Sequence, residues 1–123
     1  MELRGEMEIS YSVEKGRLCY VIDGVLTVAD MREVQLARDQ LAAKDSIKVL
    51  AIVTSFKGYE SLEAFKNAIY GDIQMLPRLS KYAMLSDCLW LRLLVLALNL
   101  LIPKSELKAF PLCDRTLAEK WLD

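Results

Sequence analysis

Residues 47–53 of this 123-residue chain read IKVLAIV, and this stretch decides the fold class. Apart from Lys48 the run is apolar and rich in β-branched residues, which is typical of a central strand buried on both faces. Such a strand needs helices packed on its faces, so we expect an α/β protein. The neighbouring segments should then alternate between strand and helix.

The segments before this strand predict a hairpin and a helix. Residues 7–13 alternate between apolar and polar, and residues 18–22 form a second apolar run after a turn, which is a hairpin pattern. Thr27 and Asp30 have the spacing of a helix-capping box, and apolar residues then recur every three or four positions. A first helix is therefore expected over 28–43.

The segments after the central strand continue the alternation. We expect a loop over 54–60, a helix over 62–76, a strand over 82–85, a helix over 89–102 ended by Pro103, a strand over 107–112 and a short final helix capped by Asp114. The order ββαβαβαβα indicates a mixed four- to five-stranded sheet flanked by helices, in a single domain over 1–123.

Composition excludes several classes of function. The chain has no histidine, which excludes Ser-His-Asp and Cys-His catalytic pairs and histidine-ligated metals. Sixteen Lys and Arg balance 17 Asp and Glu without a basic cluster, so nucleic-acid binding is not expected. The N-terminus is acidic and lacks the pattern of a secretory signal, and a cytoplasmic location is the expectation.

The remaining reactive side chains have plainer explanations than catalysis. The cysteines at 19, 88 and 113 have neither metal-site nor disulfide spacing, so they are expected to be reduced core thiols, with no metal and no cofactor. Asp23, Asp30, Glu60 and Glu63 include candidate acid–base pairs, but capping of helix N-termini explains such carboxylates better. We expect no enzyme activity.

The predicted helix over 89–102 carries more apolar residues than a helix on a sheet needs. The window 83–102 has 16 apolar residues of 20, whereas the rest of the chain has 50 of 103, an ordinary fraction. Arg92 and Asn99, seven positions apart, share one narrow polar stripe. The other sides must therefore meet the protein's own core, a second copy, an apolar ligand or lipid.

A membrane span is the poorest of these explanations. Fourteen helical residues reach about 21 Å, short of the ~30 Å hydrocarbon core of a bilayer. A helix lying in the membrane interface usually has a broad basic face. Here Arg92 and nearby Lys104 supply only two basic residues. Burial in a homodimer or against a ligand is favoured, and peripheral membrane contact is the weaker option.

Two stretches resemble a known family. Residues 23–30 read DGVLTVAD, and residues 56–60 read FKGYE. They resemble SpoIIAA-like proteins, a bacterial family with a variant of the STAS and CRAL-TRIO-type fold. In that family a Gly-x-Leu-Thr-x-x-Asp turn ends the second strand, and a Phe-x-Gly-aromatic element ends the third. The resemblance covers residues 6–122 and implies a STAS-like fold.

The resemblance implies two different activities. One is binding of a lipid or other apolar ligand, as in CRAL-TRIO-type domains. The other is an anti-anti-sigma role, in which a serine opening the helix after the third strand is phosphorylated. The Asp-Ser-Ser-Gly motif of that role is replaced here by Lys-Gly-Tyr-Glu-Ser over 57–61, so only Ser61 could be the phosphosite. A serine at this position is also an ordinary helix N-cap.

We therefore predict a non-enzymatic STAS-like domain that binds an apolar ligand or self-associates through its third helix. Ligand crevices in open α/β sheets form at the carboxyl ends of strands where the connections reverse direction, which points to 54–60 and 86–89. The predicted apolar cleft lies between the second and third helices and is lined by Tyr59, Phe65, Ile69, Trp90, Leu93, Leu94 and Ala97. The alternative is that these residues are ordinary core, since apolar residues at helical spacing usually are.

Overall fold

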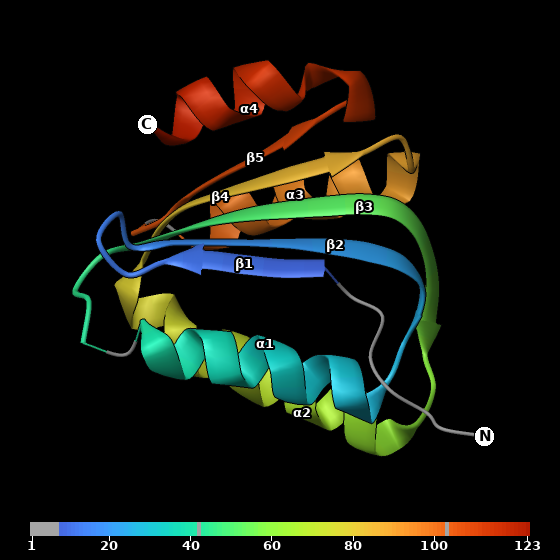
Figure 1. Ribbon diagram of the computed structural model, residues 1–123. Helices are drawn as coiled ribbons and strands as arrows, with labels where there is room; N and C mark the ends of the chain where they lie inside the picture. Colours follow the sequence, from blue (N-terminus) through green and yellow to red (C-terminus); the bar gives the residue numbers. More distant parts are fainter. Residues whose placement is uncertain (1–7, 42, 103) are drawn as a thin grey trace.

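A computed structural model describes residues 8–41, 43–102 and 104–123, and it has the predicted order of elements (Figure 1). The strands are β1 (Glu8–Ser12), β2 (Arg17–Leu26), β3 (Ile47–Tyr59), β4 (Leu79–Ser86) and β5 (Glu106–Phe110). The helices are α1 (Val28–Gln40), α2 (Leu62–Met75), α3 (Leu89–Leu101) and α4 (Arg115–Leu122). The predictions at Met7 and Pro103 fall outside the described residues.

The five strands lie side by side in the order β1-β2-β3-β4-β5, antiparallel between β1 and β2 and parallel thereafter. Side chains of α1, α2 and α3 pack on the face to which Val49, Ala51 and Val53 point. Helix α4 packs on the opposite face, over Leu50 and Ile52. Figure 1 shows α4 alone above the sheet, with α1 and α2 below it.

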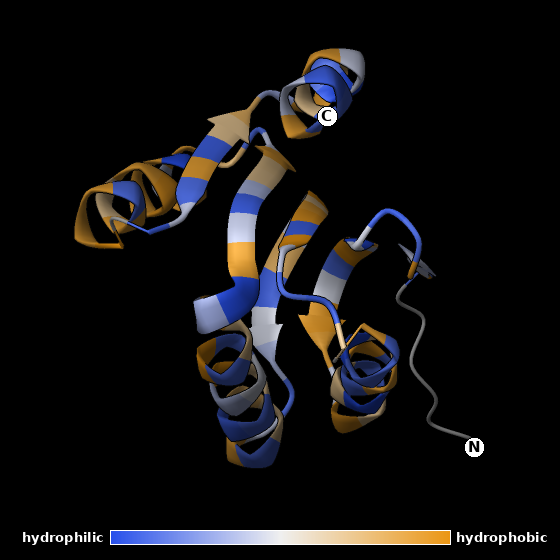
Figure 2. Ribbon diagram, turned by 90° about the vertical axis from the view of Figure 1, so that its left-hand side faces the viewer, coloured by the Kyte–Doolittle hydropathy of each residue, from blue (hydrophilic) through white to orange (hydrophobic). Residues whose placement is uncertain are grey.

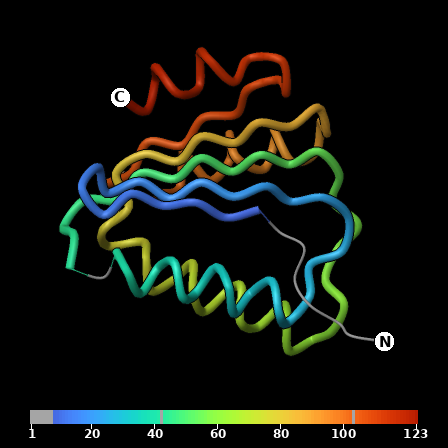
Figure 3. The backbone as a smooth tube through the Cα atoms, viewed as in Figure 1, coloured from blue at the N-terminus to red at the C-terminus, as the bar shows by residue number. Residues whose placement is uncertain are grey.

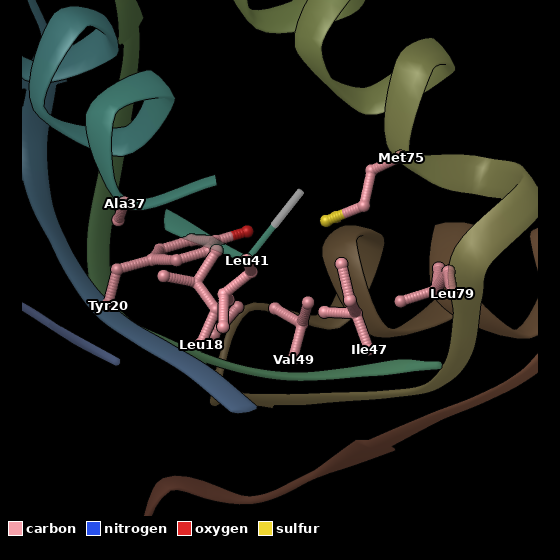
Figure 4. Close-up of a cluster of buried hydrophobic side chains, with 9 residues drawn as sticks. Leu18, Tyr20, Ala37, Leu41, Ile47, Val49, Met75 and Leu79 are labelled. Atoms are coloured by element: carbon pink, nitrogen blue, oxygen red, sulfur yellow. The ribbon is translucent and has the colours of Figure 1, made fainter. Parts of the chain in front are cut away.

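The core beneath α1 and α2 includes the buried Tyr20 (Figure 4), and the partly buried Tyr82 packs against it. Tyr20 lies among Leu18, Leu41 and Val49, and its side chain hydrogen-bonds that of Tyr82. Burial raises the pKa of Tyr20 to about 12 and raises that of Tyr82 well above its ordinary value. Both phenols are therefore neutral and satisfy each other inside the core.

The prediction of a loop over 54–60 was wrong, because β3 continues as a strand to Tyr59. Strand β2 continues beside it as far as Leu26, which pairs with Tyr59. The pairing contains irregularities, and Gly24 and Gly58 have φ of 91° and 97°, values open mainly to glycine. The two strands therefore leave the sheet as a bent ribbon, which Figure 3 shows curving towards α1 and α2.

Other boundaries differ by a few residues. Helix α1 ends at Gln40 rather than 43, and β4 starts at Leu79 rather than 82 because its first residues pair with β3 and β5. Asp114 precedes α4, but its side chain makes no cap hydrogen bond, since a 3₁₀ turn runs directly into the helix. All three cysteines are free thiols, yet Cys113 is exposed rather than in the core.

Helices α1 and α2 pack closely through small residues. The side of α2 that is buried carries Ala64, Ala68, Gly71 and Met75. At Gly71 the buried guanidinium of Arg38 passes over the α2 backbone, and its Nη2 lies 2.6 Å from Oδ1 of Asp72. A Cβ on residue 71 would lie 1.6 Å from Arg38 Nη1. The absence of a side chain at residue 71 therefore leaves the space that the Arg38 guanidinium occupies.

We predict that Gly71→Ala lowers the free energy of unfolding, although alanine is the better helix former by about 1 kcal/mol. The added methyl group must displace the buried Arg38, and overpacking of this kind typically costs about 1–3 kcal/mol. Urea unfolding followed by circular dichroism measures the change.

In an Arg38→Ala background, Gly71→Ala should instead raise the free energy of unfolding, because the arginine atoms that the methyl group would meet are gone. Asn67→Ala, at an exposed position of the same helix, is the matched control and should change stability little. Stabilisation by Gly71→Ala in the wild-type background would contradict the assigned role of Arg38.

Candidate functional site

A row of four aromatic rings connects the start of α2 to the start of α3. Phe65 lies edge-on to Tyr59 with ring centroids 5.3 Å apart, and Tyr59 lies edge-on to Phe56 at 5.7 Å. Phe56 in turn lies 6.0 Å from Trp90. Such arrangements are favourable aromatic pairs. This aromatic row brings together three predicted site residues, and β3 supplies its two central rings.

The other predicted residues of the cleft extend from the two ends of the row. On α2, Ile69 lies one turn after Phe65 on the same side of the helix. On α3, Leu94 and Ala97 share the side of Trp90. All of these side chains are exposed, between 40% and 55% for Phe65, Ile69, Trp90 and Leu94. The side chains of α2 and those of α3 therefore do not cover one another, and both sets are exposed to solvent.

Leu93, three residues after Trp90, lies at the border of this side of α3. It lines a separate groove between α3 and the edge strand β5, with a volume of about 530 Å³. The groove is lined by Leu89, Arg92, Leu93, Leu96 and Asn99 of α3, Glu106 to Ala109 of β5, and Trp121 of α4. Sequence reasoning missed this groove and the central position of Phe56. The alternation of charged and apolar residues over 106–109 was the available signal for a strand edge there.

Helix α3 is apolar on nearly every side and is mostly uncovered. Within α3, all of whose residues are described, Leu91 and Val95 are the buried side chains. Figure 2 shows the helix as an almost continuous hydrophobic coil standing apart from α1 and α2. Most of the apolar excess of this helix therefore lies on the surface of the described chain and not in its core. Across the described part of the chain, none of the helices has the length and apolarity needed to cross a membrane.

The prediction that the strand connections reverse direction near 54–60 and 86–89 was wrong. Neighbouring strands follow the chain order throughout the sheet, so the connections do not reverse direction among the described strands. No switch-point crevice forms there. What brings residues 56–59 and 90 together is the bent extension of β3, which carries Phe56 and Tyr59 past the end of the sheet to the N-terminus of α3.

The carboxylates near the aromatic row cap helices. Thr27 and Asp30 form the predicted capping box, with hydrogen bonds of 2.9 and 3.0 Å between each side chain and the other residue's backbone N–H. Glu60 Oε1 accepts from the N–H of Val28 at 2.8 Å, at the start of α1. These carboxylates sit at the positive end of a helix dipole.

Ser61 occupies the N-cap of α2, as one of the two interpretations predicted. Its Oγ accepts from the N–H of Ala64 at 3.1 Å, and the residue is exposed. Among the described residues, no cluster of three or more cysteine, aspartate or glutamate side chains has the geometry to hold a metal ion. Asp30, Glu60 and Ser61 therefore all serve as helix caps beside the aromatic row.

Comparison with known proteins agrees with the family resemblance and with the fold. A family model of SpoIIAA-like proteins matches residues 17–123. The chain belongs to the SpoIIAA-like family. Its predicted α/β fold is confirmed by a crystal structure of an uncharacterized protein of the DUF3478 family from Shewanella loihica PV-4, which has a SpoIIAA-like fold. The TM-score is 0.77 at 23% identity, with 100% of this chain and 98% of the other covered. No curated protein matches the sequence.

We predict that Ser61→Ala lowers the free energy of unfolding by about 1 kcal/mol, because the N–H of Ala64 loses its acceptor. Ser61→Asp should leave stability within a few tenths of a kcal/mol of wild type, since aspartate is an equally good N-cap. Urea unfolding of the three proteins measures both effects. An unchanged stability of Ser61→Ala would contradict the capping role of this serine.

Proposed function

We propose that this SpoIIAA-like domain is non-enzymatic and binds an uncharged lipid or other apolar molecule between α2 and α3. The observation that carries the proposal is the aromatic row with the exposed apolar sides of two helices at its ends. A ligand lying along Phe56 and Tyr59 would contact Phe65 and Ile69 on one side and Trp90 and Leu94 on the other.

The free energy available from covering these side chains supports binding. Phe65, Ile69, Trp90 and Leu94 are each roughly half exposed. Burying a large apolar side chain completely is worth about 1.5–3 kcal/mol, so covering the exposed halves of four would contribute roughly 3–6 kcal/mol. The apolar surface of the ligand itself adds to this gain, while ordering of the ligand opposes it.

The charge of the surroundings indicates the kind of ligand. The predicted lining residues are all uncharged, and burial raises the pKa of the Tyr59 hydroxyl, with the charge of Asp72 adding to the shift. That hydroxyl is therefore neutral and can exchange a hydrogen bond with one polar group of a ligand. An apolar molecule with a single small polar group fits this surface better than a charged metabolite does.

Peripheral membrane contact would present the same apolar sides to a lipid surface, and it is the weaker form of the proposal. The narrow polar stripe of α3 carries one cation, Arg92, where an interfacial helix usually has many. The proposed lack of an enzymatic role is supported by the hydrogen bonds of Asp30 and Glu60, whose carboxylates cap the start of α1. The alternative is a phospho-regulated interaction module of the anti-anti-sigma type, and the N-cap geometry of Ser61 explains that residue without it.

We expect the purified protein to bind N-phenyl-1-naphthylamine, a neutral apolar fluorophore, with increased emission. Ile69→Lys and Leu94→Lys should each weaken binding at least tenfold, because each places a charge on one wall of the cleft, and about 1.4 kcal/mol is tenfold in affinity. Fluorescence titration measures the dissociation constants, and mass spectrometry of an organic extract of the native protein identifies any lipid that co-purifies.

The matched control is Leu36→Lys, which changes an exposed leucine on α1. It should leave the affinity for the fluorophore unchanged. Equal binding by Ile69→Lys, Leu94→Lys and wild type would overturn the proposed position of the ligand.

A further inference from the structure

The outward side of α3 carries a regular line of leucines. Leu89, Leu93, Leu96 and Leu100 are spaced four, three and four residues apart, which is the spacing of the contact line in a coiled coil. Their exposed fractions are 67%, 55%, 60% and 80%. We call these four residues the leucine seam.

The leucine seam is left largely uncovered by the described part of its own chain, which contacts it along the groove beside β5. The inward side of α3 carries Leu91 and Val95, which pack on Met84, Val53 and Leu107. At about 100° per residue, the seam lies on the opposite side of the helix. Its cover must therefore come from another molecule.

Beside the leucine seam, the groove along β5 has charges of both signs at its rim. Arg92 and Lys108 are cations and Glu106 is an anion, with Glu106 and Lys108 two positions apart on one face of the strand. Asn99 Oδ1 accepts from the N–H of Leu107 at 2.9 Å. This side-chain hydrogen bond occupies an N–H of β5 that an added strand would need. Pairing of a further strand with β5 is therefore disfavoured at this position.

We propose that the leucine seam and the β5 groove form an interface that docks a second copy of this chain, with Leu93 and Leu96 beside a two-fold axis. In a two-fold interface each surface meets itself, so the leucine line packs against a leucine line. The same symmetry lets the rim anion of each copy approach the rim cations of the other. The interface is centred on a side of α3 about 100° around the helix from Trp90 and Leu94, so it does not depend on the proposed ligand cleft.

A second copy fits this surface better than a lipid bilayer does. The rim is nearly balanced in charge, and the whole chain has a net charge of −1, so anionic headgroups gain little attraction. A thirteen-residue helix is about 20 Å long and about 10 Å wide, which supplies only part of the roughly 800 Å² per partner of a standard interface. The groove residues, including Trp121, must supply the rest, and we expect a dissociation constant of about micromolar order.

Sedimentation velocity of the full chain over a range of concentrations tests the proposal. The weight-average mass should rise from 14.0 kDa towards twice that value as the concentration increases. Leu93→Lys and Leu96→Lys, separately, should each raise the dissociation constant at least tenfold, because each brings two cations together at the centre of the apolar contact. Both leucines are more than half exposed in the monomer, and circular dichroism checks that the variants remain folded.

Leu36→Lys on α1 is the matched control and should dimerise like wild type. Leu96→Lys should also keep the wild-type affinity for N-phenyl-1-naphthylamine, whereas Leu94→Lys should lose that affinity, which separates this interface from the ligand cleft. The proposal is overturned if the wild-type protein keeps a mass of 14.0 kDa at a protein concentration several hundred times the expected dissociation constant. Equal dimerisation of Leu93→Lys, Leu96→Lys and wild type also overturns it, as does seam-dependent binding to phosphatidylcholine vesicles by a protein that remains monomeric.

Discussion

The arrangement of this protein depends on one constraint, the pairing of four consecutive parallel strands in chain order. Each parallel connection needs a helix, and right-handed crossovers that all step in the same direction place every such helix on the same face of the sheet. Helices α1, α2 and α3 therefore share one face, while α4, which follows the last strand, covers the other. Helix α3, over the edge pair β4 and β5, is the end member of this layer and has a neighbouring helix on one side at most.

Packing within that layer determines which apolar side chains remain uncovered. Helices α1 and α2 approach closely because α2 turns its small residues and Gly71 inwards, and Arg38 crosses the helix at that glycine. The larger residues of α2, Phe65 and Ile69 among them, are consequently left at its side. The bent ribbon of β2 and β3 then carries Phe56 and Tyr59 to the same place. The apolar surface between α2 and α3 follows from close packing elsewhere in the layer.

Much of the fold was predictable because its signals are local. The buried strand at 47–53, the capping box at Thr27 and Asp30, and the helical periodicity of α2 and α3 each depend on neighbouring residues, and the structure confirms them. The path of residues 54–59 was not predictable in the same way. These residues read as a loop, and they become strand only because β2 extends beside them and two glycines allow the ribbon to bend.

The sequence by itself determined the α/β class and the presence of one helix with more apolar surface than a core can use, because composition and periodicity do not depend on distant contacts. Only the tertiary structure decided which sides of that helix are available. It turned Trp90, Leu94 and Ala97 towards the aromatic row and placed Leu93 with the groove beside β5. The physical reason is that a helix with only a narrow polar stripe has little in its own sequence to orient it, so its rotation is determined by how Leu91 and Val95 pack on the sheet and by the hydrogen bond of Asn99 to β5.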